Sequence, residues 1–320
     1  MKKIIRVTGL CLLSLPPFSS AATAQVDYLL SDAGGSASTP SFIRLQGEFV
    51  GNDGSNLESE NEFENEFEFE NEEEAEEERI ETERHDFTQS TTVVGRGRFQ
   101  AEFGYTFFQN SGETEVEDSH ATPELLLRFG LTEKVEFRLR YNEVWQFGEE
   151  DRSGSEDLRF GFKLRTTDQA GWIPESALET RFSAPTGGGE FSTDEVEFGL
   201  DYIYGWKISP RAEIYGSSGF STNSLGDFAF RPDDPAEEEF MLYTQSVALG
   251  VELTERVTSY TEFFGLFTDG FEDDEENPVF FNVGVDYYVS DNFVLDVRAG
   301  TGINDDAEDL FFGMGGAFRF

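Results

Sequence analysis

The part of the chain from Gly97 to Phe320 consists of stretches of roughly ten residues in which apolar and polar side chains alternate. Because successive side chains of a β-strand point to opposite faces, this period of two predicts strands with one apolar and one polar face. In the stretch 157–165, for example, Phe160 and Phe162 share one face, and Arg159 and Lys163 share the other. We place about twelve strands, at 97–108, 119–130, 135–147, 156–167, 176–185, 193–206, 211–222, 240–253, 257–268, 278–289, 293–303 and 309–320.

The connections between these stretches alternate between short and long. Leu131–Lys134 and Leu253–Arg256 are short turns with the similar sequences LTEK and LTER, whereas 148–155 and 223–239 are long and acidic. The connection 168–175 is an exception, because it is long where a short turn is due. Short turns at one rim and long loops at the other are typical of outer-membrane barrels, with the turns in the periplasm. An even number of strands places both ends of the chain on that periplasmic side.

The predicted polar faces carry both signs of charge on neighbouring strands, which favours a membrane barrel over a soluble β-sandwich. In a narrow lumen such charges pair with each other, while the opposite face meets lipid. We therefore expect a transmembrane antiparallel up-and-down β-barrel of about 12 strands over 97–320, with its apolar face outside. The alternation puts Glu143 on the apolar face, which is the one exception we note; a β-bulge or a position above the bilayer would explain it.

Aromatic residues lie near several predicted strand ends, at Trp145, Trp206, Tyr287 and Phe320. Amphipathic rings prefer the headgroup region, so this placement fits an aromatic belt in the lipid bilayer of the outer membrane. Phe320, with Phe318 two residues before it, is similar to the terminal aromatic residue that the barrel-assembly machinery recognises. We expect the bilayer and that machinery to be partners of this chain.

Residues 1–24 have the pattern of a cleaved signal peptide. A basic start is followed by a short apolar run, Val7–Leu15, and by the small residues Ala-Thr-Ala at 22–24. Cleavage before Gln25 removes Cys11, the single cysteine, so we expect no disulfide and no thiolate metal site in the mature chain. Export of this kind fits the outer membrane of a Gram-negative cell.

Residues 25–80 form an acidic low-complexity segment, densest from Glu58 to Glu83. The formal charge of the whole chain is −42, which excludes nucleic acid as a partner because phosphates would be repelled. Like charges this dense favour a solvated, disordered periplasmic segment. Weak binding of Ca²⁺ or of a protein partner is the alternative.

The stretch 81–96 lies between the acidic segment and the first predicted strand, and it carries polar side chains of varied type. Two interpretations remain open, a plain lead-in or a segment that folds into the lumen as a plug. For the plug, Arg84 would pair with a carboxylate such as Glu102, Glu195 or Glu197. The plug candidates are Arg84, His85, Asp86 and Phe87.

Three motifs resemble the "MetA-pathway of phenol degradation" family: TERHDFTQSTTVV at 82–94, GRFQAEFGYTF at 97–107 and HATPELLLRFGLTEKVEFRL at 120–139. Glu83 and His85 stand where members commonly have Asp and Pro. The resemblance covers about 82–320 and excludes the acidic segment. It implies an outer-membrane barrel, often described as a transporter, and it brings no catalytic residues.

The residues that could carry catalysis are few. His85 and His120 are the only histidines, and Ser119 cannot pair with its neighbour His120 because adjacent strand residues point to opposite faces. His120 and Glu124 would share a face and form a weak metal-ligand pair at best. We expect no cofactor, no metal site and no enzymatic activity; an outer-membrane lipid-acting enzyme that uses His120 is the least favoured alternative.

The function that we expect is an outer-membrane channel for passive passage of small molecules, with aromatic or other hydrophobic compounds among the candidate solutes. Acidic loops would favour cations at the rims. The main alternative is a closed structural or interaction barrel with an acidic periplasmic tail. The residues predicted to line the solute path are Glu136, Arg138, Arg140, Arg159, Lys163, Arg165, Glu195 and Glu197.

Overall fold

The computed structural model describes residues 79–84, 87–110, 116–148, 150–188, 191–222, 240–269 and 277–320. Those residues form one antiparallel sheet of thirteen strands. None of them forms a helix long and apolar enough to cross a bilayer. The strands are β1 (Phe99–Gln109), β2 (Val116–Gly130), β3 (Val135–Gly148), β4 (Arg152–Ser155), β5 (Leu158–Thr167), β6 (Glu175–Ala184), β7 (Phe198–Ser209), β8 (Ala212–Thr222), β9 (Met241–Thr254), β10 (Val257–Asp269), β11 (Val279–Ser290), β12 (Phe293–Gly302) and β13 (Leu310–Arg319).

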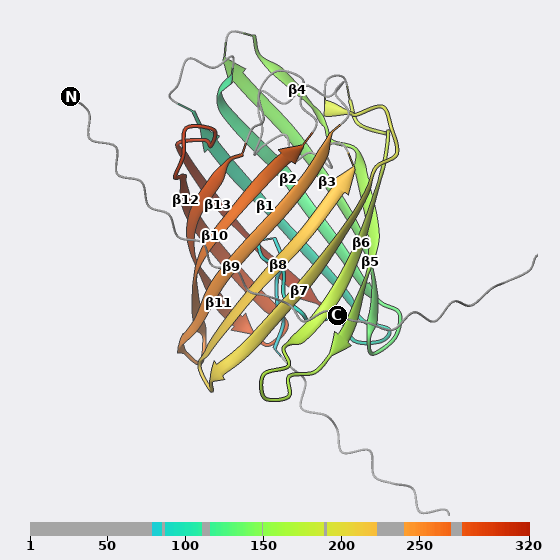
Figure 1. Ribbon diagram of the computed structural model, residues 1–320, viewed down its shortest axis with the longest axis vertical. Coiled ribbons are helices and arrows are strands. Elements are labelled where there is room, and N and C mark those ends of the chain that lie inside the picture. Colours follow the sequence, from blue (N-terminus) through green and yellow to red (C-terminus); the bar gives the residue numbers. More distant parts are fainter. Residues whose placement is uncertain are drawn as a thin grey trace, which may run out of the picture. The chain divides into compact units, whose positions relative to one another are not determined.

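Twelve of the strands close into a barrel, and the short β4 pairs with the loop-end part of β3 on the same edge as β5 (Figure 1). Each strand pairs with its neighbour in the chain except that β3 pairs with both β4 and β5, and β13 pairs with β1. The closing pair is continued by Phe320, whose N–H donates to Phe99 O at 2.8 Å while Phe99 N–H donates to Phe320 O at 3.3 Å. Closure leaves no free edge, so the backbone of the wall is hydrogen-bonded as lipid requires. The predicted barrel is confirmed.

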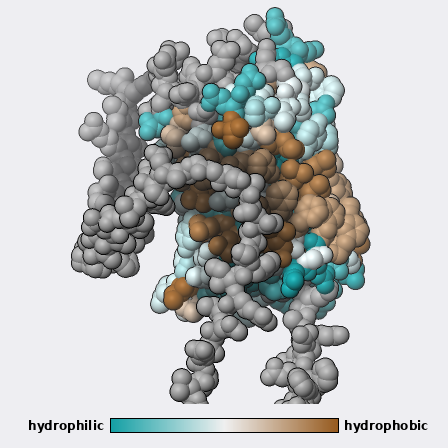
Figure 2. All heavy atoms as spheres, turned by 90° about the vertical axis from the view of Figure 1, so that its right-hand side faces the viewer, coloured by the Kyte–Doolittle hydropathy of each residue, from teal (hydrophilic) through white to brown (hydrophobic). Residues whose placement is uncertain are grey.

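The side chains along each strand alternate between an exposed outer face and a buried inner face. In β5, Phe160, Phe162 and Leu164 are exposed, whereas Arg159 and Lys163 are buried. The arrangement is inverted relative to a soluble protein, since the apolar residues face outward and the charged residues face the lumen. Figure 2 shows the result as apolar residues across the middle of the visible wall, with hydrophilic residues above and below.

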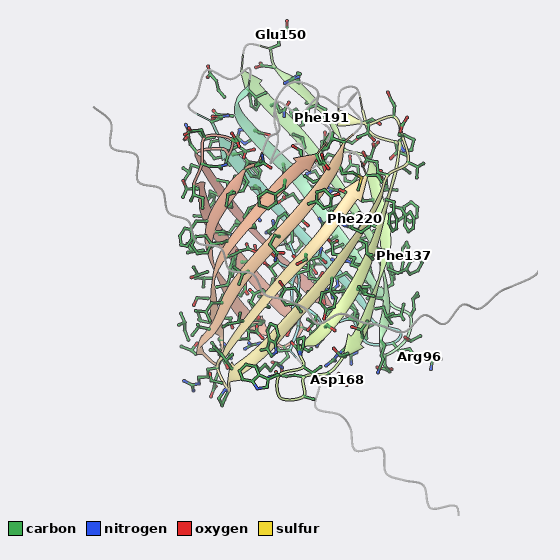
Figure 3. The ribbon with its side chains drawn as sticks, viewed as in Figure 1. Arg96, Phe137, Glu150, Asp168, Phe191 and Phe220 are labelled. Carbon is green, nitrogen blue, oxygen red and sulfur yellow. The ribbon has the colours of Figure 1, made fainter. Side chains whose placement is uncertain are left out.

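The short connections gather at one end of the barrel, which we call the turn end, and the long ones at the other, the loop end. Figure 3 shows Arg96 and Asp168 at the turn end and Glu150 at the loop end. The long connection between β5 and β6 lies at the turn end, where an Ala170–Ile173 bridge closes it and Trp172 is 95% exposed.

Most predicted strand bounds lie within three residues of the observed ones, and two departures have a physical cause. First, 148–155 is not a simple loop, because β4 pairs with residues 143–146 and extends the β3 hairpin. Glu143 does lie on the outer face, opposite Ser155 of this extension at the loop end.

The second departure is β7, which begins at Phe198 and not at 193. The carboxylate of Asp157, just before β5, accepts bonds from Thr186 N–H, Gly187 N–H and Thr193 N–H at 2.8–3.0 Å. Asp157 therefore holds residues 186–187 and 193 together in a loop, although the alternation of apolar and polar residues continues up to Phe198. The signal peptide and nearly all of the acidic segment lie outside the described residues.

Candidate functional site

Residues 79–84 and 87–96, which we call the luminal segment, lie inside the barrel and are drawn in blue-green in Figure 1. The segment starts at the turn end, where Ile80 N–H donates to Asp291 O at 2.8 Å. It also ends there, where Gly97 N–H donates to Gly130 O at 2.8 Å. Between these points it contacts inward side chains of β2, β3, β5, β9, β10 and β12. The segment therefore enters the lumen and returns to the same end before β1 begins.

Glu83 is the centre of a buried ion cluster on one wall. Its carboxylate pairs with Arg128 of β2 at 3.2 Å, with Arg138 of β3 at 2.5 Å and with Lys163 of β5. Its N–H donates to Glu102 Oε2 at 2.8 Å. Burial alone would raise the pKa of Glu83, but the three surrounding cations outweigh it and hold this pKa well below the ordinary value. Glu83 is therefore a carboxylate anion at neutral pH.

Further carboxylates surround the same cations, so the cluster is nearly neutral as a whole. Arg128 also pairs with Glu136 at 2.9 Å and with Glu102 at 3.3 Å, and Arg138 pairs with Glu179. Glu136 in turn accepts a bond from Val94 N–H at 2.6 Å, which holds the returning part of the luminal segment against β3.

Arg84 points to the other side of the segment. Its guanidinium bridges Glu124 of β2 at 2.8 Å and Asp296 of β12 at 2.5 Å. Burial disfavours its charge, but these carboxylates outweigh that effect and raise the pKa of Arg84. The guanidinium lies over Gly104 of β1 and Gly315 of β13, which are paired across the seam that closes the barrel. A Cβ at either position would overlap it, so the two glycines make the space that Arg84 occupies.

The tip of the luminal segment is bound to β10 by polar and aromatic contacts. The Glu262 carboxylate accepts from Phe87 N–H at 3.1 Å and from Thr88 N–H at 2.6 Å. The ring of Phe87 stacks on Phe264, two residues further along the same strand. Phe264 belongs to a buried apolar cluster on the inner wall toward the loop end, with Phe108, Ala121, Phe240, Leu242, Leu266, Phe280 and Phe311.

Two cavities lie beside the luminal segment. One of about 380 Å³ at the turn end is lined by side chains of both signs, among them Arg79, Glu81, Arg165, Glu175 and Glu213. A smaller one of about 20 Å³ lies between β2, β3, β5 and β6, and its lining includes Arg138, Arg140, Arg159, Glu179 and Arg181.

The structure places most of the predicted path residues on the inner face. Glu136, Arg138 and Lys163 belong to the ion cluster, and Arg140 is paired in register with Arg159 on the next strand. Arg165 lines the larger cavity and pairs with Asp168 at 3.1 Å.

The strand predicted at 193–206 placed Glu195 and Glu197 on the inner wall, and this placement needs a correction; their part in a solute path stays a prediction. Glu195 is exposed in the connection before β7, because this strand starts later than predicted. Glu197 is buried next to the start of β7, where Ser183 Oγ donates to its carboxylate at 3.2 Å. Burial raises the pKa of Glu197 to about 8. It lies at the loop end and outside the strand itself.

Arg84 pairs with two inward carboxylates, but these are Glu124 and Asp296 and differ from the examples Glu102, Glu195 and Glu197; the charge of Glu102 also favours its guanidinium. Of the other plug candidates, Phe87 is described above, and His85 and Asp86 lie outside the described residues.

The suggested His120–Glu124 metal pair is excluded by a register shift in β2. The shift falls between Ala121 and Glu124, so Glu124 turns inward to Arg84 while His120 faces outward. His120 contacts Tyr105 Oη through Nδ1 at 2.8 Å and packs edge-on against Phe147. Ser119 is buried on the opposite, inner face, as adjacency on a strand requires. Among the described residues no group of three or more His, Cys, Asp or Glu side chains could hold a metal ion.

Several residues of the site were not among those predicted from the sequence, including Arg128, Glu262, Phe264, Asp296 and Glu179. Arg128 lies two residues from Leu126 on the inner face of β2, so alternation within 119–130 was a usable signal. Glu262 and Phe264 alternate with exposed residues in β10 in the same way. An inward phenylalanine does not fit the simple rule that apolar side chains face outward and polar ones inward, so this rule does not predict Phe264 as a site residue.

Among solved structures, the chain is similar to the COG4313 outer membrane channel from Pseudomonas putida F1, with a TM-score of 0.55 and 11% identity over 75% of this chain and 100% of that one. It is also similar to the NanC porin, with a TM-score of 0.45 and 7% identity over 69% and 100% of the two chains. The KdgM porin has a TM-score of 0.41 and 11% identity, over 68% of this chain and 99% of that one.

The likeness to the COG4313 channel shows a shared barrel fold. No curated protein matches the sequence. A family model does match, over residues 82–320, which include most of the luminal segment and all thirteen strands. The chain belongs to the family described as "Putative MetA-pathway of phenol degradation".

Proposed function

We propose that this protein is a passive outer-membrane channel for small molecules, and that the luminal segment forms its constriction. The observation that carries the proposal is the inward wall of charged residues around a segment that is held by side chains and not by a continuous sheet ladder. A barrel with a purely structural role needs no such wall, because an apolar filling would be at least as stable.

The outer face supports placement in the outer membrane. Large apolar side chains are exposed around the wall, including Phe162, Val247, Val283 and Val297, with exposed fractions of 41–49%. Burying this surface in lipid is favourable, whereas in water it would promote association. In this orientation the turn end faces the periplasm, the loop end faces outward, and Phe320 would be read by the barrel-assembly machinery.

The family description and the aromatic cluster support small aromatic solutes as cargo. The residues proposed to line the route are Glu136, Arg138, Arg140, Arg159, Lys163 and Arg165. Charges of both signs fill the lumen, so the interior itself sets no strong preference for either sign of charge.

The experiment is ion conductance of the purified mature protein in planar bilayers, combined with solute entry into proteoliposomes. A channel gives discrete conductance steps and solute entry. A folded, heat-modifiable barrel that gives neither would contradict the proposal.

A closed structural or interaction barrel is the second candidate, and the dense contacts of the luminal segment favour it, since they fill much of the bore. Removing residues 26–78 separates the two candidates. Loss of binding to periplasmic proteins with no channel activity before or after the deletion favours the closed barrel, whereas unchanged conductance favours the channel. We propose no catalytic role, because Ser119 and His120 lie on opposite faces of the wall.

A further inference from the structure

Two chemically different walls face each other across the lumen. The cations around Glu83 lie on β2, β3 and β5, and we call them the cationic wall. Phe264, Phe280 and Phe311 on β10, β11 and β13 form the aromatic wall, and the apolar cluster to which they belong extends further to β9, β1 and β2. In the closed order of twelve strands, β10 is six positions from β3 in either direction, and β11 is six positions from β5. Phe264 and Phe280 therefore lie on strands opposite those that carry Arg138 and Lys163, whereas Phe311 on β13 lies nearer to β2.

The luminal segment touches both walls with matching chemistry. Glu83 presents a carboxylate to Arg128, Arg138 and Lys163. Four residues later, Phe87 presents an aromatic ring to Phe264, with a centroid distance of 4.5 Å and an interplanar angle of 3°. The segment thus places one carboxylate against the three cations and one aromatic ring against Phe264.

We propose that Glu83 and Phe87 occupy the binding positions of the solute, and that the solute is an aromatic carboxylate that displaces them. This inference rests on the proposed channel function and names its substrate class. An arylalkyl carboxylate such as 3-phenylpropionate carries both groups in one small molecule. Its carboxylate would pair with Lys163 and the two arginines in place of Glu83, and its ring would stack on Phe264 in place of Phe87.

The electrostatics of the cationic wall give the selectivity for an acid. When Glu83 withdraws, Arg128 keeps Glu102 and Glu136, and Arg138 keeps Glu179, whereas Lys163 loses the carboxylate with which it pairs. A buried cation that loses its partner is costly. A neutral phenol or alcohol cannot replace that partner, whereas a carboxylate forms charge-assisted hydrogen bonds to arginine. Above this site, Arg140 and Arg159 are paired in register and line the small cavity with Arg138 and Arg181, so the cationic surface continues toward the loop end.

The aromatic wall gives the selectivity for a ring. Phe264 packs on Phe280 with a centroid distance of 4.8 Å, and Phe280 lies 6.0 Å from Phe311. Stacked and edge-on rings stabilise an aromatic guest beyond the area that it buries. An aliphatic acid of the same size forms the ion pair but lacks the additional stabilisation from ring–ring contacts.

The luminal segment is attached to the barrel, so it competes with the solute at a high effective concentration. For a short tether this is on the order of millimolar, and the solute must therefore be supplied at a comparable concentration. Weak, competitive binding suits a channel, since a solute that opens the route must also leave it.

The test uses the full mature chain in planar bilayers with three probes of similar size: 3-phenylpropionate, 3-phenylpropanol and 3-cyclohexylpropionate. At about ten times its Kd, a ligand that binds only the displaced state raises the open population about tenfold. We expect this rise with 3-phenylpropionate and not with the neutral alcohol or the aliphatic acid. Equal responses to all three probes, or no response to 3-phenylpropionate, would overturn the proposal.

Variants separate this inference from the proposed function itself. Glu83→Gln and Phe87→Leu should raise the basal conductance and reduce the response to 3-phenylpropionate, and Phe160→Leu on the outer face should behave as wild type. Heat-modifiable mobility on gels identifies any variant that does not fold. If Glu83→Gln does not fold, Phe87→Leu, which retains an apolar side chain, still tests the inference. Variants that conduct while the wild type ignores 3-phenylpropionate contradict only this inference. Absence of conductance in every folded variant contradicts the channel.

Discussion

Glu262 of β10 holds the tip of the luminal segment through the backbone of Thr88, whose N–H donates to its Oε1 at 2.6 Å. The same carboxylate accepts Phe87 N–H at 3.1 Å, Thr88 Oγ1–H at 2.5 Å and Asn282 Nδ2–H at 3.1 Å. An ionised carboxylate is an acceptor only, so all four donors are compatible with it at once. One side chain of the wall therefore satisfies two successive backbone donors that the segment would otherwise leave unpaired.

Glu262→Gln is expected to loosen this tip and raise the basal conductance. The amide replaces one acceptor oxygen by a donor, so at least one of the four bonds is lost and a charge-assisted contact becomes a neutral one, at a cost of about 1–3 kcal/mol. Single-channel recording measures the open fraction. Glu213→Gln is the matched control, because Glu213 lines the turn-end cavity without a bond to the tip. Equal effects of the two variants would show that Glu262 does not hold the segment.

Arg128→Met is expected to destabilise the barrel strongly. Arg128 faces Glu83, Glu102 and Glu136, and its removal leaves three buried carboxylates with fewer cations. Removing one member of a buried ion pair typically costs about 3–5 kcal/mol. Urea unfolding of the refolded protein in lipid vesicles measures the loss. Arg256→Met, in the exposed turn between β9 and β10, should change the free energy of unfolding by less than about 0.5 kcal/mol.

The Glu83 cluster should give the barrel a stability that is lost only in acid. The pKa of Glu83 is lower in the folded protein than in the unfolded chain, where it is about 4.3. Its contribution is therefore complete above the unfolded value and decreases as the pH falls toward the folded one. Unfolding free energies measured between pH 3 and pH 7 should decrease in acid for the wild type, and this component should be absent from Glu83→Gln. Identical pH profiles for the two proteins would contradict the ion pairing described here.

Glu197, at the loop end, should give the opposite dependence of the free energy of unfolding on pH. Burial raises its pKa to about 8, so the folded protein keeps a proton that the unfolded chain has released above about pH 4.3. Stability therefore decreases between these two values, by at most about 1.4 kcal/mol per pH unit. Glu197→Gln should match the wild type near pH 4.5 and exceed it at pH 8. Glu195→Gln, two residues away and exposed, is the control and should change neither value.

A charge in the middle of the outer face should destabilise the barrel in lipid, and the effect should depend on depth. Val283 lies near the middle of β11 with 41% of its surface exposed, whereas Leu253 lies at the turn end of β9. Arginine at the bilayer midplane costs about 2–4 kcal/mol, and near the interface about 0–1 kcal/mol. Val283→Arg should therefore be much less stable than Leu253→Arg when both unfold from vesicles. Similar losses in the two variants would mean that lipid does not surround this belt.

The strand positions were predictable because an alternating sequence has only two registers relative to the lipid, and the wrong one exposes charge to it. The start of β7 was not, since Val196 and Phe198 continue the alternation and only the carboxylate of Asp157, from another part of the chain, turns 193–197 into a loop. The register shift in β2 was equally hidden, and it separates His120 from Glu124.

The contacts of the luminal segment could not be predicted from the sequence for another reason. Which carboxylate meets Arg84 depends on how the twelve strands are staggered around the ring, and Asp296 lies 212 residues away in the chain. That stagger is set by the sum of all the pairings and has no signature in any one of them. Glu262 is likewise one inward carboxylate among many, and only the three-dimensional path of the segment distinguishes it.

The guanidinium of Arg84 lies over paired glycines of the first and last strands, with no room there for a side chain on either. The join of the wall is thus shaped around a part of the same chain that lies just ahead of the first strand. A ring that closed without this stretch would have a hollow at its own closure point, so filling that hollow is a task of the residues ahead of the first strand.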